Sequence, residues 1–320
     1  RGVIDGHVYG IAALYGTMSG TLVNEADGTI SGGDVAVYIA DSFASWTGGI
    51  ENYGLIEGDG AGIQIGSTSA DPWLDGVVFA GGIVNGGDGE IIAASGPAIA
   101  IGGKSFAGGL QNAGTIEGTV GVLVKAKTFD GGLVNGEGGV IEGRTGPAVW
   151  IEPRTQTFAG GIDNKGKIIG ATDGLLVEAA EFIDGIVNAA TAEVFGRYRV
   201  AVRIGGGSFH GGIVNHGLID GKLGGVSIDS AFFYGGLYNG ALAKILAHEG
   251  DAVFASAAWS GAFENHGLIS GGARGFAYQG PGFDGDVLNK GAIYGGGVGF
   301  FMAVPVFDGR DMDIDRPGQG

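Results

Sequence analysis

One thirteen-residue pattern recurs along the whole chain, and this repeat limits the possible fold more than any other feature of the sequence. Residues 106–118 read FAGGLQNAGTIEG, and residues 209–221 read FHGGIVNHGLIDG. An asparagine marks each of the eleven copies, at Asn24, Asn52, Asn85, Asn112, Asn135, Asn164, Asn188, Asn215, Asn239, Asn265 and Asn289. The gaps between them are 28, 33, 27, 23, 29, 24, 27, 24, 26 and 24 residues, a mean of 26.5. A period of this length is typical of solenoids and other stacked repeats.

Each copy contains three segments with the alternating pattern of β-strands. The first segment ends at the asparagine. Two positions before the asparagine stands an apolar residue, and four positions before it, in ten of the eleven copies, a glycine. Six positions before the asparagine stands an aromatic residue in every copy except the first, which has Met18; these residues are Trp46, Phe79, Phe106, Phe129, Phe158, Phe182, Phe209, Phe233, Trp259 and Phe283. The second segment has the form Gly-x-Ile-x-Gly, and the third alternates as in VAVYI at 35–39.

These segments predict an all-β fold, a parallel β-helix (β-solenoid) of about 11–12 coils of about 26 residues, with three short strands per coil. We expect residues 1–320 to form a single repeat-built solenoid, with a partial coil at 1–16 and a degenerate half-coil at 307–320. By analogy with other folds of this kind, the coil is expected to be right-handed. Coils that stack at the strand spacing of about 4.8 Å would give a rod on the order of 50 Å long.

A kelch-type β-propeller is the alternative fold. The distance from the asparagine to the next isoleucine-type position is six residues in copies one, three, five, seven and nine and four in the others, so two copies form a unit of about 51 residues. The basic unit of about 26 residues is too short for a four-stranded blade, which favours the solenoid.

The alternation also predicts where the repeated side chains point. If the first segment is one strand, its aromatic, glycine, aliphatic and asparagine positions share one face, which we assign to the interior. The aromatic rings would then stack in a column, and the asparagines would hydrogen-bond to one another in a ladder. The position three before the asparagine is glycine in eight of eleven copies. This glycine column predicts either tight bends or a flat face against which another chain or a sugar lies.

Charge and composition exclude several functions. The formal charge of −17 disfavours nucleic acid and anionic membranes as partners. The chain has no Cys, which rules out disulfides and thiolate metal sites. No apolar run is long enough for a membrane-spanning helix, so membrane insertion is not expected. His216 and His266 follow ladder asparagines, but no third metal ligand can be placed beside them. We therefore expect no metal, no other cofactor and no catalytic residues.

An enzyme remains the alternative to a purely structural role, because polysaccharide lyases and pectinases also use parallel β-helices. Such enzymes group carboxylates on one strand face beneath irregular loops. Here the recurring acids Glu57, Glu117, Glu142 and Asp220 occupy matching positions in their copies, which we expect to be solvated corners. No copy breaks the repeat in the way expected at a catalytic site, so we predict a protein that is not an enzyme.

The two ends of the sequence are incomplete copies. Residues 2–6 (GVIDG) form a second segment without a first, and FDGRDMDID at 307–315 forms a first segment with Asp313 in place of the asparagine. Three interpretations stay open: a segment of a longer solenoid, a subunit that stacks head to tail, or an end covered by a cap of charged residues.

The FxGGIxNxGxIxG pattern resembles the Gly/Asn-rich repeats in the passenger regions of autotransporter-like surface proteins of Gram-negative bacteria. The resemblance covers nearly the whole chain, and it implies export to the cell surface, a β-helical stalk and a role in adhesion or surface structure. We therefore expect a non-catalytic extracellular protein, such as a surface filament, a surface-layer component or an adhesin stalk. Its partners would be copies of itself, along the glycine face or head to tail, or surface glycans. The alternative is a carbohydrate-active or glycan-binding β-helix.

Overall fold

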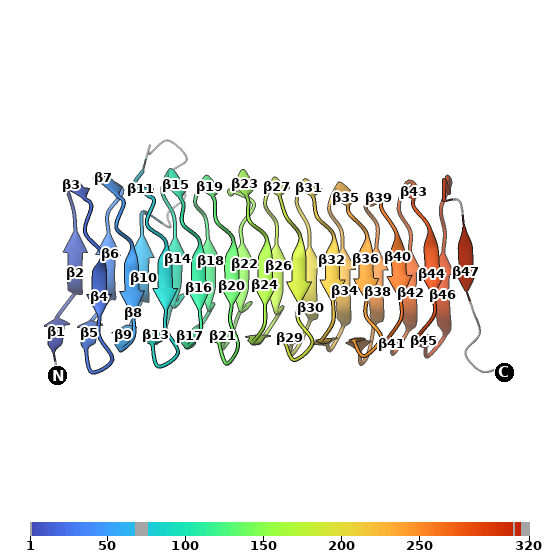
Figure 1. Cartoon of the computed structure of the whole chain (residues 1–320), viewed down its shortest axis with the longest axis horizontal. Coiled ribbons are helices and arrows are strands. Elements are labelled where there is room, and N and C mark those ends of the chain that lie inside the picture. Colours follow the sequence, from blue (N-terminus) through green and yellow to red (C-terminus); the bar gives the residue numbers. More distant parts are fainter. Residues whose placement is uncertain (1, 68–75, 310, 315–320) are drawn as a thin grey trace.

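The chain forms a rod of stacked β coils (Figure 1). The computed structural model describes residues 2–67, 76–309 and 311–314. All strand pairs in this part of the chain are parallel, and each strand pairs with the equivalent strands of the neighbouring coils, as β1 (Val3–Gly6) does with β5 (Thr29–Gly32). The predicted parallel β-solenoid of about 12 coils of about 26 residues is therefore confirmed.

Each coil has four strands in four parallel sheets, so the prediction of three strands per coil was wrong. The sheets contain 12, 12, 11 and 12 strands and are called A, B, C and D in the order in which a coil passes through them. The additional strand arises because the segment from the aromatic residue to the asparagine bends at its glycine pair. In the copy around Phe129 the bend separates β19 (Thr128–Phe129) of sheet C from β20 (Leu133–Asn135) of sheet D.

Sheets A and B hold the second and third segments of the repeat. The strands of sheet A are β1 (Val3–Gly6), β5 (Thr29–Gly32), β9 (Leu55–Gly58), β13 (Glu90–Ala93), β17 (Thr115–Gly118), β21 (Val140–Gly143), β25 (Lys167–Gly170), β29 (Glu193–Gly196), β33 (Leu218–Gly221), β37 (Lys244–Ala247), β41 (Leu268–Gly271) and β45 (Ala292–Gly295). Those of sheet B are β2 (Tyr9–Ala13), β6 (Val35–Ile39), β10 (Ala61–Ile65), β14 (Ile99–Ile101), β18 (Val122–Val124), β22 (Val149–Ile151), β26 (Leu175–Val177), β30 (Val200–Ile204), β34 (Gly224–Ile228), β38 (Asp251–Ala255), β42 (Arg274–Tyr278) and β46 (Val298–Met302).

Sheets C and D hold the aromatic residues and the asparagines. The strands of sheet C are β3 (Gly16–Met18), β7 (Phe43–Trp46), β11 (Val78–Phe79), β15 (Ser105–Phe106), β19 (Thr128–Phe129), β23 (Thr157–Phe158), β27 (Glu181–Phe182), β31 (Ser208–Phe209), β35 (Phe232–Tyr234), β39 (Ala258–Ser260) and β43 (Phe283–Asp284). Those of sheet D are β4 (Leu22–Asn24), β8 (Ile50–Asn52), β12 (Ile83–Asn85), β16 (Leu110–Asn112), β20 (Leu133–Asn135), β24 (Ile162–Asn164), β28 (Ile186–Asn188), β32 (Ile213–Asn215), β36 (Leu237–Asn239), β40 (Phe263–Asn265), β44 (Val287–Asn289) and β47 (Met312–Ile314).

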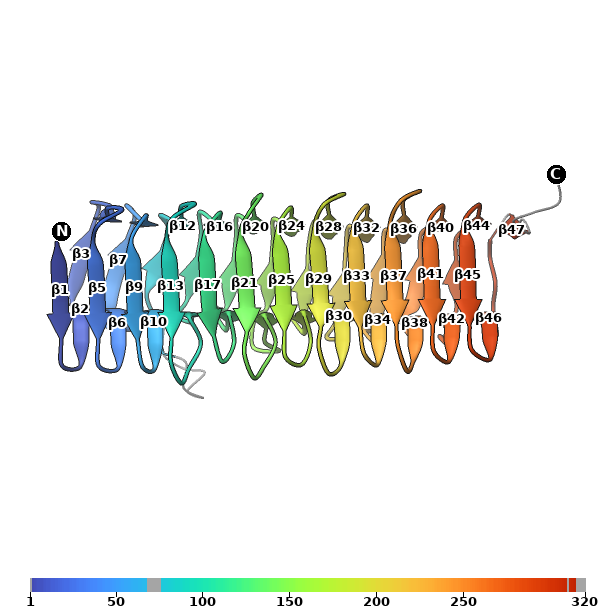
Figure 2. The same ribbon diagram turned by 90° about the horizontal axis from the view of Figure 1, so that it is seen from below.

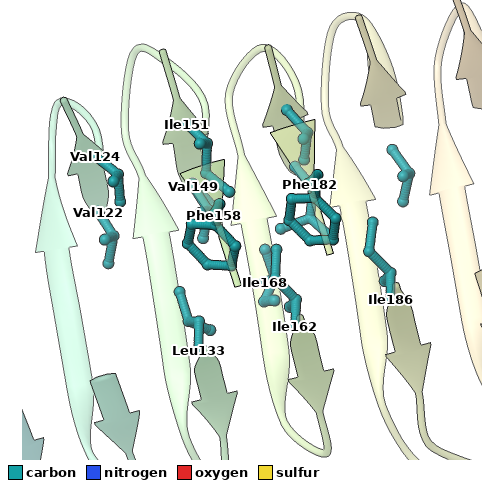
Figure 3. Packing of buried hydrophobic residues seen from close by; sticks show 14 of the residues in the cluster. Val122, Val124, Leu133, Val149, Ile151, Phe158, Ile162, Ile168, Phe182 and Ile186 are labelled. Carbon is teal, nitrogen blue, oxygen red and sulfur yellow. The ribbon is translucent and has the colours of Figure 1, made fainter. Parts of the chain in front are cut away.

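The core is one continuous cluster of apolar side chains that fills the interior of the rod, from Ile30 to Val287. Figure 3 shows how every sheet contributes to it: Ile168 comes from sheet A, Ile151 from sheet B, Phe158 from sheet C and Ile162 from sheet D. Because each coil is too thin to bury its own apolar residues, the core is completed only when neighbouring coils stack. In the described part of the chain, no helix is long and apolar enough to cross a membrane.

Candidate functional site

The eleven asparagines form one continuous ladder inside the corner between sheets D and A. Each asparagine pairs with the asparagine of the next coil in the strand register, as Asn135 does with Asn164. The side-chain Nδ2 of each one donates to Oδ1 of the next at 2.7–2.9 Å, ten times in succession from Asn24 to Asn289. The predicted asparagine ladder is thus confirmed, and all its hydrogen bonds point in the same direction along the rod.

Backbone hydrogen bonds hold each asparagine in this orientation. The Nδ2 of Asn135 also donates to the carbonyls of Gly139 in its own turn, at 3.2 Å, and of Lys167 in the next coil, at 3.1 Å. All eleven asparagines are buried, with at most 5% of their surface exposed. A buried amide without partners is costly, so a side chain that satisfies both of its polar ends inside the corner is required here, and asparagine has the matching length and polarity.

The aromatic residues of sheet C form a second column. Phe129 and Phe158 stack with ring centroids 4.5 Å apart and an interplanar angle of 8°. The rings of Phe158 and Phe182, both labelled in Figure 3, have centroids 5.0 Å apart and an interplanar angle of 2°. The column runs from Trp46 to Phe307, and the rings from Trp46 to Phe283 are buried. Its two tryptophans satisfy their indole N–H groups on backbone carbonyls, Trp46 on Gly20 and Trp259 on Gly261.

The glycine pair between the two columns forms a corner of the coil. Gly131 and Gly132 have φ of 97° and 68°, in the left-handed region that glycine adopts without strain. A Cβ on Gly132 would also lie 2.1 Å from the carbonyl oxygen of Gly160 in the next coil. The prediction that the glycine four residues before the asparagine lies on an inward strand face was therefore wrong, because it turns the chain. Of the two interpretations of the glycine three residues before the asparagine, the structure supports the tight bend.

The last coil departs from the predicted alignment. Phe307 pairs with Phe283, but Asn289 pairs with Ile314, and Asp313 pairs with Leu288. The prediction that Asp313 occupies the ladder position was wrong, because this coil has one more residue between the aromatic position and the ladder position than the coil before it. Arg310, Asp315 and Arg316, which belong to the charged cap considered above, lie outside the described residues.

The recurring acids lie on strands and not at corners, so that part of the prediction was also wrong. Glu57, Glu117, Glu142 and Asp220 share one register column on the outer face of sheet A, where Ile92, Ile169 and Phe195 interrupt them. Glu117 and Glu142 form ion pairs with arginines of other coils. Burial raises the pKa of the Asp220 carboxyl, although His248 lies 3.0 Å away and opposes this shift. Arginines thus compensate two members of this interrupted acidic row.

The two histidines of interest flank a tyrosine on the outer side of sheet D. The ring of Tyr238 lies 5.6 Å from that of His216 and 5.4 Å from that of His266, with tilted planes. The Nε2 atom of His266 is 3.6 Å from a carboxylate oxygen of Glu264. No group of three or more potential metal ligands occurs among the residues that the structure describes.

The turns that follow the asparagines alternate in length and give one edge of the rod a toothed profile. Five long turns, residues 25–28, 86–89, 136–139, 189–192 and 240–243, are each closed by a hydrogen bond between their last N–H and first C=O. Between them lie short turns such as 216–217 and 266–267. Figure 2 shows the long turns after β20, β28 and β36 projecting beyond their neighbours. We call this side of the rod the toothed edge.

One gap of the toothed edge forms a groove of about 730 Å³. The long turns 189–192 and 240–243 flank the short turn of His216 as two of its walls, and its lining extends past the first of them to the coil of Asn164. The lining residues are Asp163, Lys165, Val187, Ala189, Ala190, His216, Gly240, Ala241 and Leu242. Asp163 and Lys165 form an ion pair of 2.7 Å with each other. The side chain of Leu242, at the tip of its turn, is almost fully exposed, at 93%.

A small group of exposed aromatic residues lies on the outer side of sheet C near the same coils. Tyr234 stacks on His210 at 4.8 Å, and the ring of Phe232 lies 6.1 Å from that of Tyr234. Phe232 and Tyr234 are both exposed. Neither this group nor the groove was anticipated from the sequence. The sequence signal of the toothed edge is the alternation between six and four residues from the asparagine to the next isoleucine-type position.

Comparisons with known proteins leave the family open. No protein-family model, no curated protein and no solved structure matches this chain. The assignment that stands is a parallel β-solenoid repeat with an asparagine ladder.

Proposed function

We propose that this chain is a non-catalytic, extracellular structural rod, working as a surface filament, a surface-layer component or an adhesin stalk. The observation that carries the proposal is the unbroken asparagine ladder, in which ten consecutive buried side-chain hydrogen bonds connect the coils from Asn24 to Asn289. A catalytic site is expected where a regular structure is broken, and this ladder continues through eleven coils without a break.

The mechanism of such a rod is mechanical. From the coil of Asn52 to the coil of Asn289, each coil is connected to the next by four parallel strand pairings, by the stacked aromatic rings and by the ladder, so none of these coils can leave the stack without breaking all of them. This arrangement resists local opening and proteolysis, which act on weakly held segments. Location at the surface of a Gram-negative bacterium is part of the proposal because of the resemblance to autotransporter-like passenger repeats, and right-handed winding is part of it by analogy with other folds of this kind.

Electron microscopy of the protein on its native cell tests the proposal. Gold-labelled antibodies against residues 1–320 should mark thin projections outside the outer membrane. Head-to-tail assembly of the chain would give filaments with an axial repeat on the order of 55–60 Å, the length of about twelve coils. Label confined to the cell interior would refute the extracellular role.

A glycan-binding protein is the second candidate, and the exposed group of Phe232, Tyr234 and His210 favours it. Flat aromatic rings on a protein surface are common contact points for apolar faces of ligands. Binding of the chain to a glycan array, lost in Tyr234→Ala and retained in Tyr294→Ala, would support this candidate. Tyr294 is a suitable control because it is an exposed tyrosine on sheet A, away from the group.

A further inference from the structure

The charge of the long turns divides the toothed edge into two halves. The first three long turns carry Glu25, Asp27, Asp88 and Glu137. The last two, 189–192 (AATA) and 240–243 (GALA), carry no charge. They form the walls of the groove described above, and Leu242 projects beside it. An apolar groove and an exposed leucine thus lie next to each other on one face of the rod.

The chemistry of the groove restricts what can occupy it. The carboxylate and the ammonium group that line it among the described residues belong to Asp163 and Lys165, which form an ion pair with each other. An acidic turn placed there would lose its hydration without gaining a partner, which is unfavourable. A small, uncharged, apolar turn fits the groove, and the chain itself presents such a turn at 240–243.

We propose that the groove binds the 240–243 turn of a second copy of this chain, so that two rods pair side by side and antiparallel through their toothed edges. The inference rests on the proposed role as a self-assembling rod and names the face and direction of the contact. Leu242 of each copy enters the groove of the other, which makes the interface isologous and closed. The rods are offset so that the twofold axis lies between the coil of Asn215 and the coil of Asn239.

The spacing of the teeth is compatible with this interdigitation. Long turns flanking the groove are two coils apart, about 9.6 Å, so an inserted turn lies about 4.8 Å from each wall. Backbones approach this closely when the side chains between them are small, and these two turns consist of Gly, Ala and Thr apart from Leu242. The antiparallel direction also places the acidic long turns of the two rods at opposite ends of the pair. That separation reduces repulsion between chains that each carry a formal charge of −17.

Disulfide crosslinking tests the contact, because the natural chain has no Cys. In the proposed pair the two Leu242 residues are about one coil apart, within the Cα range of a disulfide. Leu242→Cys should therefore form a covalent dimer under mild oxidation. Asp88→Cys, at the equivalent position of an acidic turn, should not. Thr191→Cys should also stay unlinked, because the two Thr191 residues would be about three coils, or 14 Å, apart. Equal crosslinking of all three variants, or preferential crosslinking of Thr191→Cys, would overturn the proposed register.

Sedimentation measurements test the pairing without crosslinks. The wild-type chain should show a concentration-dependent dimer, and Leu242→Asp should weaken the association at least about 100-fold, since two leucines leave the interface. Leu223→Asp, at an exposed leucine in a turn between sheets A and B, should leave it unchanged. A wild-type chain that stays monomeric at about 1 mM overturns the pairing. The pairing is then also wrong if the groove proves to bind a glycan. That result would leave the rod function, which is tested by microscopy on cells, unaffected.

Discussion

Replacing one asparagine in the middle of the ladder tests how much the column contributes to stability. The Oδ1 of Asn164 accepts hydrogen bonds from Nδ2 of Asn135, at 2.8 Å, and from the backbone N–H of Gly166, at 3.3 Å. Its Nδ2 donates to Oδ1 of Asn188, at 2.8 Å, and to the carbonyl of Glu193, at 3.1 Å. All of these groups meet at a side chain that is fully buried. Asn164→Ala removes the four bonds together.

The size of the effect follows from which partners are left without a replacement. Nδ2 of Asn135 keeps two backbone acceptors, so its loss is modest. Oδ1 of Asn188 loses its ladder donor inside a buried corner, and an orphaned buried polar group costs about 1–3 kcal/mol. With the second lost ladder bond and the small cavity, we expect a loss of about 3–5 kcal/mol.

Urea unfolding and hydrogen exchange measure this effect, with Asn289→Ala as the matched control. Asn289 is the last asparagine of the ladder and shares only one ladder bond, from Asn265 at 2.7 Å, so its replacement should cost about 1–2 kcal/mol. Because a solenoid can open at a weakened coil, amides in the coils beside Asn164 should exchange faster in Asn164→Ala than in the wild-type chain. Equal losses for the two variants, or less than about 1 kcal/mol for Asn164→Ala, would refute the view that the ladder is a continuous, mutually dependent structure.

Three further predictions concern the corner, the aromatic column and one buried carboxyl. Gly132→Ala should lower the urea midpoint much more than Gly138→Ala. Both positions have positive φ, but only at Gly132 would the new Cβ meet backbone atoms. Similar midpoints for the two variants would contradict the need for a close approach between the backbones of neighbouring coils at Gly132. Phe158→Ala should cost about 3–5 kcal/mol in urea unfolding, since the ring is buried between two stacked neighbours, and a loss under about 1 kcal/mol would argue against a tightly packed column. Burial raises the pKa of the Asp173 carboxyl above its usual value, an effect that Arg199 opposes, so the folded state binds this proton more tightly than the unfolded state does. Ionisation of this carboxyl therefore destabilises the fold at pH values above the raised pKa. Asp173→Asn should have a higher thermal midpoint than wild type at neutral pH, and this gain should disappear as the pH falls through that pKa. A gain that does not depend on pH would contradict this reasoning.

The stacking of the coils could be predicted from the sequence because it depends on features that recur at a fixed period. Asn, the aromatic residue and the central Ile of Gly-x-Ile-x-Gly recur in the same order in nearly every copy, and residues that repeat in this way lie above one another in a stacked fold. The ladder followed from the chemistry of asparagine, which carries both a donor and an acceptor at its end.

The number of strands per coil could not be predicted by the same reasoning. Alternation along FxGGIxN suggested one strand, because period two continues through the glycine pair when only residue types are counted. The bend depends on φ values such as the 97° and 68° of Gly131 and Gly132, and residue type alone permits but does not require them. Asp184 likewise shows that residue type does not determine the backbone conformation, since it adopts a φ of 77° at a corner where the other copies have glycine.

The groove was missed for a different reason. It depends on how far two turns project, and not on any residue type that marks a site. The alternation in turn length was visible in the sequence, but its consequence for the surface appears only when the coils are stacked and the long turns come to lie two coils apart.

The uniform direction of the asparagine hydrogen bonds gives the rod an internal polarity. Each side-chain amide dipole lies head to tail with the next, so the column resembles a single-file chain of aligned dipoles from Asn24 to Asn289. Reversing one amide would bring two N–H groups or two oxygens face to face, so the orientation of any member fixes that of all the others. A coil that has just folded therefore presents an amide donor to the coil that follows. When the coils form one after another from the N-terminal end, each finished coil serves as an oriented template for the next.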